Sequence, residues 1–553
     1  MTRTRIIVGI LLLSTAILFS PELSTAQTSA SAALTGRVSS QEEGPMEGVL
    51  VSAGKAGSTI RVTVASDQQG RYRFPRNRLE PGEYALTIRA VGYEVDPTQV
   101  TITPQKPAMA DLRLRKTQDL SGQLTNAEWL LSMPGGDRKN FLLNCTTCHT
   151  LQRIVYSKHD ATEFTKVLQR MAGNSPGSWP TSSPLFPQNI NAPRDLDRNP
   201  ERFRKQAEFL STINLSSVPK WEYPLKTLPR PKGKSTHMVI TEYQLPRQDA
   251  HPHDVIRGSD GMAWYMDFEA PYFGKLDPQT GHVTEYPVPL VKPERRGGGL
   301  EVQEDKDGNI WIGLRSQSAV AKFDKKSSQF QMFPIPNDLN PRGTAQVAMV
   351  EPTSSHVDGK VWMRLPGSEY QLMRVDVTTG KFDAVKPLAD GHGSYGISPD
   401  SRNNLYFMDL ESEYIGRVDS KTLDVKYYRT PTRTSLPRRG HLDTQDRLWF
   451  AEYFGNQVGM FDPRTEQFQE WAIPTPWTNP YDAVADKNGE VWTGGMSSDR
   501  IIRINSKTGE TTEYLLPEET NVRRVFVDNA TTPVTFWVGN NNRASIIKLE
   551  PLE

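Results

Sequence analysis

The chain has 553 residues, which at about 150 residues per domain suggests three or four domains. Its 65 basic and 64 acidic residues nearly cancel, so the composition carries no electrostatic footprint for nucleic acid and no nucleic-acid partner is expected. With 2 cysteines, a disulfide scaffold and a four-cysteine zinc or iron–sulfur site are excluded. The 41 prolines and 40 glycines favour many turns and short strands.

Residues 1–26 have the pattern of a secretory signal peptide. Arg3 and Arg5 precede an apolar run from Ile6 to Phe19, and small residues stand before a cleavage point after Ala26. The run is about 14 residues long, too short for a comfortable membrane span, and an uncleaved anchor is the alternative. The sequence therefore predicts an exported protein, periplasmic or extracellular, with no membrane span after signal cleavage.

Residues 33–116 are expected to be all-β. Short alternating runs such as Arg61–Val64 and Arg71–Phe74 are separated by turns such as Asp67–Gly70 and Pro81-Gly82, which favours a small antiparallel β-sandwich. The order Asp-x-x-Gly-x-Tyr-x-Phe followed by Pro-Gly-x-Tyr resembles the carboxypeptidase regulatory-like domain. That resemblance implies a spacer or docking module without catalytic residues.

Both cysteines lie in one motif, Cys145-Thr146-Thr147-Cys148-His149, within a segment covering 119–217. Two thiols three positions apart can each add to a vinyl group of haem, and the adjacent His149 can reach the iron. A redox dithiol or half of a zinc site is the alternative, but a dithiol does not need the histidine. The motif predicts covalent haem c held by Cys145, Cys148 and His149.

Helices are predicted over 124–131, 160–172 and 202–213. Three helices around such a motif resemble a class I-type cytochrome c domain. The resemblance implies an α-helical haem domain with a methionine as the sixth iron ligand, for which Met171 is the candidate. The alternatives are Met171 as a core residue and an open sixth position, and His159 is expected at the surface. Residues 218–236, rich in proline and lysine, are expected to form a linker.

Residues 237–553 repeat a unit of about 43 to 51 residues, a period typical of a β-propeller with four strands per blade. One aromatic residue marks each unit: Trp264, Trp311, Trp362, Tyr406, Trp449, Trp492 and Trp537. Residues 238–245 repeat the outermost strand with no unit before them, and the last unit lacks that strand. The N-terminal strand is therefore predicted to close a ring of seven blades.

The repeats resemble the streptogramin (virginiamycin B) lyase family in Trp449-Phe450-Ala451-Glu452 and Tyr414–Val418. The resemblance implies elimination chemistry that opens a cyclic ester with Mg²⁺, using histidine and glutamate on late blades. In this sequence the two blade-start histidines of the family fall on Arg438 and Tyr481, and its acid falls on Gly495. The family's lyase chemistry is therefore not expected at those positions.

Other polar residues fall at strand ends or blade starts, on one predicted rim of the channel. The catalytic candidates are Asp267, His253, Asp409 and Glu452, with Glu269, Glu411, His251, His392 and His441 near them. Carboxylates and imidazoles there suit a divalent metal or proton transfer. Donors for an anionic group are Arg296, Arg315, Arg364, Arg438 and Arg439. The alternative is that these are ordinary polar loops with structural turn acids.

The expected fold class is multidomain and mainly β: a small β-sandwich, an α-helical cytochrome c domain and a seven-bladed β-propeller. The leading hypothesis is an exported haem-dependent oxidoreductase that passes electrons between a partner protein and a substrate at the propeller. One alternative is a metal-dependent lyase or hydrolase on the propeller. The other is a non-enzymatic electron carrier whose propeller and sandwich dock a partner, a small molecule or a glycan. Fold alone does not choose between them.

Overall fold

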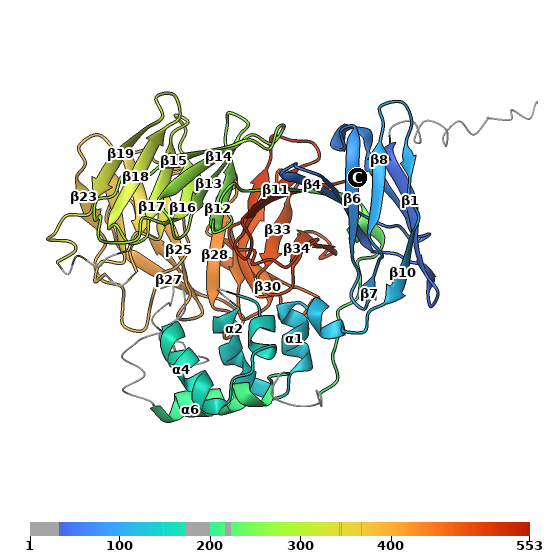
Figure 1. Ribbon diagram of the computed structural model, residues 1–553. Helices are drawn as coiled ribbons and strands as arrows, with labels where there is room; N and C mark the ends of the chain where they lie inside the picture. Colours follow the sequence, from blue (N-terminus) through green and yellow to red (C-terminus); the bar gives the residue numbers. More distant parts are fainter. Residues whose placement is uncertain are drawn as a thin grey trace, which may run out of the picture.

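The computed structural model describes residues 32–146, 149–172, 200–215, 223–341, 343, 346–366 and 368–552. The expected signal peptide lies outside these ranges. In the described ranges, no helix combines the length and the apolar character needed to cross a bilayer. Figure 1 shows a β-sandwich beside a propeller, with a group of short helices against one end of the propeller.

The N-terminal part is a β-sandwich, as predicted for 33–116. Its strands are β1 (Ala32–Ser40), β2 (Gly44–Pro45), β3 (Leu50–Lys55), β4 (Ile60–Ala65), β5 (Arg71–Pro75), β6 (Gly82–Arg89), β7 (Tyr93–Glu94), β8 (Thr98–Ile102), β9 (Ala108–Met109) and β10 (Leu112–Lys116), with the turn η2 (Arg76–Arg78). Alternation places Tyr72 and Phe74 of β5 in the core and leaves Arg71 and Arg73 exposed. Period-two burial of this kind is what one covered sheet face requires.

The C-terminal part contains seven blades, each a sheet of antiparallel neighbours. The first three blades are β12 (Pro252–Arg257), β13 (Ala263–Asp267), β14 (Tyr272–Leu276), β15 (Val283–Pro287); β16 (Gly299–Glu304), β17 (Ile310–Leu314), β18 (Ala319–Asp324), β19 (Gln329–Pro334); β20 (Met349–Glu351), β21 (Lys360–Arg364), β22 (Leu372–Asp376), β23 (Phe382–Ala384). The next three are β24 (Ile397–Pro399), β25 (Leu405–Asp409), β26 (Tyr414–Val418), β27 (Val425–Arg429); β28 (Pro437–Leu442), β29 (Leu448–Glu452), β30 (Gln457–Asp462), β31 (Gln467–Ala472); β32 (Pro480–Ala485), β33 (Glu490–Gly495), β34 (Arg500–Asn505), β35 (Thr511–Leu515). The seven predicted aromatic residues are buried in the second strands.

The last blade combines β36 (Phe526–Asp528), β37 (Thr535–Asn540) and β38 (Ser545–Pro551) with β11 (Met238–Gln244). β11 pairs with β38 from Met238 opposite Pro551 to Gln244 opposite Ser545. The predicted closure of the ring by the N-terminal strand is therefore confirmed. Shared closure of this kind leaves no open end to the ring.

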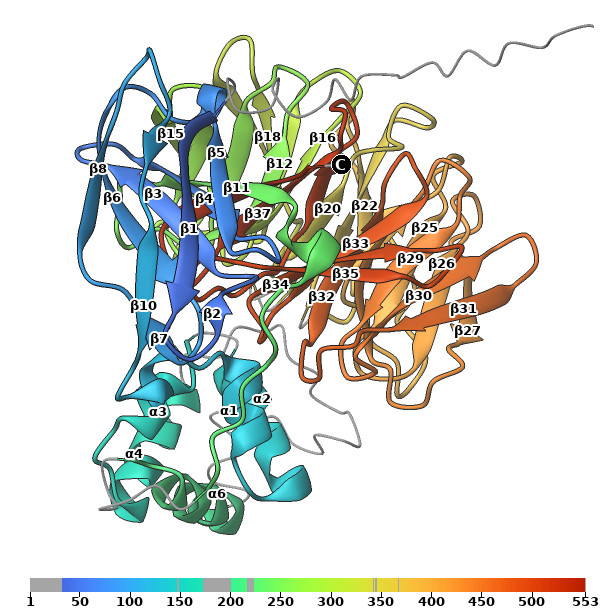
Figure 2. The same ribbon diagram turned by 90° about the vertical axis from the view of Figure 1, so that its right-hand side faces the viewer.

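The sandwich continues the sheet of this last blade. Strand β4 pairs antiparallel with β11, from Ile60 opposite Tyr243 to Val64 opposite Val239, so one sheet runs from the propeller into the sandwich (Figure 2). Arg89 adds an ion pair to Asp499 at 2.6 Å. Because backbone hydrogen bonds join the two parts, the sandwich is fixed to the propeller by strand addition.

The described residues between 119 and 215 form short helices, called here the helical cap. They are η3 (Leu120–Gln123), α1 (Asn126–Ser132), η4 (Gly136–Phe141), α2 (Leu142–Cys145), α3 (Gln152–Val155), α4 (Ala161–Ala172) and α6 (Pro200–Thr212), and η5 (Gly233–Thr236) follows before the propeller. Helix α1 begins at a capping box in which Thr125 and Glu128 bond each other's backbone N–H. Helices α1, α4 and α6 lie near the three predicted positions.

The prediction of an α-helical cytochrome c domain in the fold class is wrong. The chain is mainly β, and the α-helices of the helical cap have between 4 and 13 residues. Their core is continuous with that of the propeller: Trp129, Leu142 and Phe209 belong to one apolar cluster with Tyr395 and Tyr481 of the propeller. Helices this short depend on tertiary packing, and here the packing partner is the end of the propeller.

Candidate functional site

The end of the propeller channel that faces the helical cap is shaped by β-bulges. In four blades the inner strand loses register with its neighbour, between Pro252 and Asp254, Gly299 and Val302, Pro437 and Gly440, and Pro480 and Ala483. A bulge re-aims a side chain that the regular pleat would place elsewhere. The residues at this end, called here the mouth, are all buried, and four of them share an apolar cluster with the helical cap. They are His253, Phe268, Arg364, Tyr395, Arg438, Tyr453, Tyr481 and Arg523.

A cation surrounded by aromatic rings occupies part of the mouth. The Arg438 guanidinium lies 5.1 Å from the ring centre of Tyr395, 4.4 Å from that of Tyr453 and 4.1 Å from that of Tyr481. The hydroxyls of Tyr395 and Tyr481 are hydrogen-bonded to each other. Ring faces attract a buried cation, so this cluster holds the positive charge at the mouth. Two members of this cluster, Arg438 and Tyr481, stand at the positions where the lyase family has histidines.

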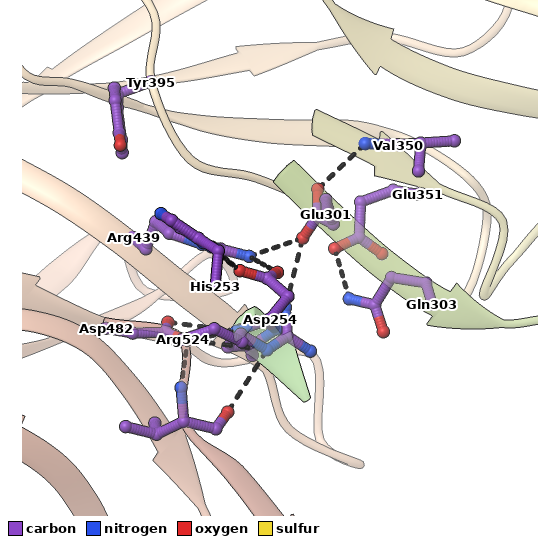
Figure 3. A network of polar contacts seen from close by, with 12 residues as sticks. His253, Asp254, Glu301, Gln303, Val350, Glu351, Tyr395, Arg439, Asp482 and Arg524 are labelled. Carbon is purple, nitrogen blue, oxygen red and sulfur yellow. Dashed lines mark hydrogen bonds and ion pairs between the residues drawn. The ribbon is translucent and has the colours of Figure 1, made fainter. Parts of the chain in front are cut away.

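His253 brings an imidazole to the mouth from the first blade. Its ring stacks on Phe268 at 5.0 Å, and its Nδ1 lies 2.5 Å from Asp254 Oδ1 (Figure 3). The carboxylate holds the hydrogen on Nδ1, which leaves the lone pair on Nε2. Burial lowers the pKa of His253 to about 3 despite the Asp254 hydrogen bond, so the ring is neutral at pH 7. Nε2 is buried and has no hydrogen-bond partner.

Directly behind the mouth is a network of paired charges, called here the belt: Asp254, Glu301, Arg439, Asp482 and Arg524 (Figure 3). Arg439 Nη2 donates to Asp254 Oδ2 at 3.0 Å and to Glu301 Oε1 at 2.7 Å. Arg524 Nη1 donates to Glu301 Oε1 at 3.1 Å. Each buried charge thus has an opposite charge beside it, as buried ions require.

The belt lowers the pKa of two of its acids, Asp482 and Asp254, whereas burial raises the pKa of Glu301 to about 7 in spite of Arg439 and Arg524. Burial alone would raise the pKa of Asp482, but His441, whose Nε2 lies 3.0 Å from Asp482 Oδ1, and Arg439 hold it well below the usual range. The same balance between burial and Arg439 lowers the pKa of Asp254. The predicted anion donor Arg439 and the predicted rim residue His441 are therefore engaged inside the protein.

The other predicted catalytic acids stay within their own blades. Asp267 accepts from the backbone N–H of Glu269 at 2.9 Å and pairs with Arg247. Asp409 accepts from Gly393 N at 3.0 Å and lies 2.8 Å from His392 Nδ1. Through these hydrogen bonds and ion pairs, both acids hold neighbouring loops in place. In the described part of the chain, no group of three or more His, Cys, Asp or Glu side chains is placed to hold a metal ion.

Glu452 differs from these two acids. Its Oε2 accepts from Gln457 Nε2 at 2.6 Å, while its Oε1 is buried without a hydrogen-bond partner. Burial raises the pKa of Glu452 to about 8, so the carboxyl is largely protonated at pH 7.

The remaining predicted rim residues have local partners. Arg296 and Arg315 both pair with Glu269, Arg315 at 3.3 Å. His251 Nδ1 lies 3.2 Å from the carbonyl oxygen of Asn541, and Glu411 N donates to Asp409 Oδ1 at 3.1 Å.

The described residues of the segment Cys145–His149 lie near the mouth. Asn521 Nδ2 of the seventh blade donates to the carbonyl oxygen of Thr146 at 2.6 Å, and Asn521 Oδ1 accepts from Arg523 Nε at 2.7 Å. Nearby, Ala127 N donates to Ser497 O at 2.7 Å. Cys145 ends α2 and is half-buried, whereas Cys148 lies outside the described residues. Met171 is the penultimate residue of α4.

The sequence analysis missed Asn521, Arg523 and Arg524. A signal for them exists, because Arg523-Arg524 in the seventh unit repeats Arg438-Arg439 in the fifth. An alignment of the first strands of the seven repeats would have shown that the two arginine pairs stand at equivalent positions around the propeller axis.

Comparison with known proteins agrees with the two β parts. Residues 33–115 match the carboxypeptidase regulatory-like domain, and residues 380–551 match the virginiamycin B lyase family. The chain carries a lyase-like β-propeller. No curated protein matches the chain. The comparisons show no cytochrome c domain.

Solved structures similar to the chain include propellers. Virginiamycin B lyase from Staphylococcus aureus is 22% identical over 56% of this chain and 98% of its own, with a TM-score of 0.48. A streptogramin B lyase is 23% identical over 56% of this chain and 97% of its own, with the same TM-score. The extracellular domain of a protein assigned to a one-component system in B. thetaiotaomicron is 18% identical over 54% of this chain and 40% of its own, with a TM-score of 0.41.

Proposed function

We propose that this is an exported haem-carrying redox protein whose lyase-like propeller binds a small molecule at its mouth. One observation carries the proposal: the backbone of Thr146, inside the Cys-x-x-Cys-His motif, is hydrogen-bonded to Asn521 of the propeller. A haem attached to Cys145 and Cys148 would therefore be held beside the arginines and tyrosines of the mouth. The proposed pathway runs between a partner protein and the ligand at the mouth.

The described residues of the motif fit a haem. His149 Nδ1 lies 2.9 Å from the carbonyl oxygen of Thr150, which keeps the hydrogen on Nδ1 and leaves Nε2 for an iron. Burial lowers the pKa of His149, which favours the neutral ring that a metal ligand must be. His149 N also donates to Cys145 O at 3.3 Å, so the two residues lie on one turn. When bound, a haem supplies one-electron chemistry.

The residues of this chain have separate tasks in the proposal. Cys145, Cys148 and His149 hold the haem, and Met171 is the proposed sixth ligand. Thr146 and Asn521 keep the motif at the mouth. The Arg438 cluster supplies positive charge and aromatic surface where a ligand would meet the haem-bearing segment.

The test is covalent haem itself. The full chain is exported from a host with c-type haem maturation, and the pyridine haemochrome spectrum is expected to show one haem c per chain. C145A and C148A should each lose most covalent haem, and the double variant all of it. The control H159A should keep it, because His159 is exposed beside Glu163. Absence of covalent haem from the wild-type protein would overturn the proposal.

A second candidate is acid–base chemistry on the propeller, a lyase or hydrolase activity. The observation that favours it is the buried, unpartnered Nε2 of His253. Such an activity should survive the Cys145 and Cys148 double substitution and disappear in H253F. The redox proposal expects the opposite result for the cysteine variant.

A further inference from the structure

Arg364 is a buried cation that lacks the partners of its neighbours. It ends β21, is 7% exposed, and its Nε has no hydrogen-bond partner. The buried Arg439 and Arg374 each contact carboxylates, at 2.7 to 3.2 Å. Arg364 instead packs over the Tyr395 ring at 5.3 Å, and no carboxylate of the described chain lies within ion-pair distance. Burial lowers the pKa of Arg364 to about 10, so it stays charged at pH 7.

Arg364 and His253 flank one pair of tyrosines. Arg364 lies on Tyr395, and the rings of Tyr395 and Tyr481 are 6.0 Å apart with their hydroxyls bonded. The His253 ring is 6.0 Å from that of Tyr481. A hydrogen-bond donor and a hydrogen-bond acceptor, both buried and both unsatisfied, therefore stand on either side of one aromatic platform.

Unsatisfied buried groups are costly. Each lowers the stability of the fold, and native proteins leave few of them. Two such groups of opposite character at the end of one channel define the chemistry of what would satisfy them. The guanidinium takes an anion, in the forked geometry that suits a carboxylate, and the imidazole Nε2 takes an O–H donor.

We propose that the mouth binds a small hydroxycarboxylate, with its carboxylate on Arg364 and its hydroxyl donating to His253 Nε2. This names the ligand class for the ligand site of the proposed function, and it does not require the haem. A haem carries carboxylates of its own, the propionates, and one of these is the other source of an anion for Arg364. The test therefore uses protein with and without covalent haem.

The probe is 4-hydroxybenzoate, compared by calorimetry with benzoate, which lacks the hydroxyl, and 4-hydroxybenzamide, which lacks the charge. Wild-type protein should bind 4-hydroxybenzoate about tenfold more tightly than either analogue, the ratio that 1.4 kcal/mol provides. R364Q should remove the preference over the amide, and H253F the preference over benzoate. The control R402Q removes one exposed charge from a turn of the fourth blade and should change neither preference.

The outcomes separate the two proposals. All measurements are repeated on the C145A/C148A protein, which carries no haem, so a failed haemochrome test leaves this test intact. Equal binding of the three probes, or an unchanged preference in R364Q, overturns the ligand proposal. Binding that appears only without haem also overturns it, because Arg364 then serves a propionate. If R364Q does not fold, R364K keeps the charge without the fork and should show a reduced preference.

Discussion

Neighbouring residues at the inner edge of the blades lie in the mouth and in the belt, and the two groups treat charge in opposite ways. His253 and Asp254, Arg438 and Arg439, and Arg523 and Arg524 each place one member in the mouth and the next in the belt. In the belt, arginines and carboxylates pair at 2.7 to 3.2 Å. In the mouth, arginines face rings, and His253 and Arg364 keep unpartnered nitrogens. Paired groups hold blades together, whereas unsatisfied ones are available to a ligand.

Breaking the belt should have the largest effect. Arg439→Met leaves Asp254 and Glu301 buried without one shared counter-charge, so we expect a loss of about 3–5 kcal/mol in the free energy of unfolding, measured by urea denaturation. R402Q, at an exposed position, should stay within about 0.5 kcal/mol of wild type. A stability of R439M close to that of R402Q would show that the belt does not support the fold.

Detaching the helical cap from the mouth should have a smaller effect. Asn521→Leu removes the donor to Thr146 O and the acceptor of Arg523 Nε, both buried, for which we expect a loss of about 1–3 kcal/mol. Amide hydrogen exchange should rise across residues 126–155 while the blades stay protected. The matched control is Asn529→Ala, at an exposed turn. Unchanged exchange in N521L would mean that apolar packing alone holds the cap.

Most of the propeller could be predicted from the sequence, because each blade repeats the same short pattern of a buried aromatic residue and turns. Each Trp at the marked positions is buried, and turn acids such as Asp305, Asp443 and Asp486 accept its indole N–H at 2.8 to 2.9 Å. The same repetition exposed the missing outer strand of the last blade. The positions of three cap helices were also predicted, at 124–131, 160–172 and 202–213, close to α1, α4 and α6.

What escaped prediction depends on contacts between distant segments. The addition of β4 to β11 joins residues about 180 apart through backbone bonds, which leave no side-chain pattern. The apolar cluster that α1 and α6 share with the blades likewise leaves no mark on local spacing, which predicts a separate domain for the short helices. For the site, His253 was identified by residue type, but its orphaned Nε2 depends on the bulge and on Asp254.

A pH-dependent test uses Glu452, an acid outside both groups with a buried, unpartnered oxygen. Its pKa is raised to about 8 by burial, so the folded state keeps a proton that the unfolded chain releases above about pH 4.5. Its contribution to stability is complete below pH 4.5 and is lost as the pH rises to 8. We expect wild type to lose about 3 kcal/mol more of its free energy of unfolding than E452Q between pH 5 and 8 in urea titrations. E466Q, exposed in the same blade, should follow wild type; identical slopes for wild type and E452Q would contradict the assignment.

The smallest effect should come from charges that are paired but exposed. Arg204 in α6 lies 2.6 Å from Glu201 and also pairs with Glu208, and all three side chains are about half exposed. Water already solvates these groups, so Arg204→Ala should leave the urea midpoint unchanged. Arg439 and Arg204 each contact two carboxylates, so burial alone distinguishes them. A shift in R204A as large as that in R439M would show that the number of partners, and not their burial, sets the cost. The lack of an ion-pair partner at the buried Arg364 would then no longer indicate a ligand site.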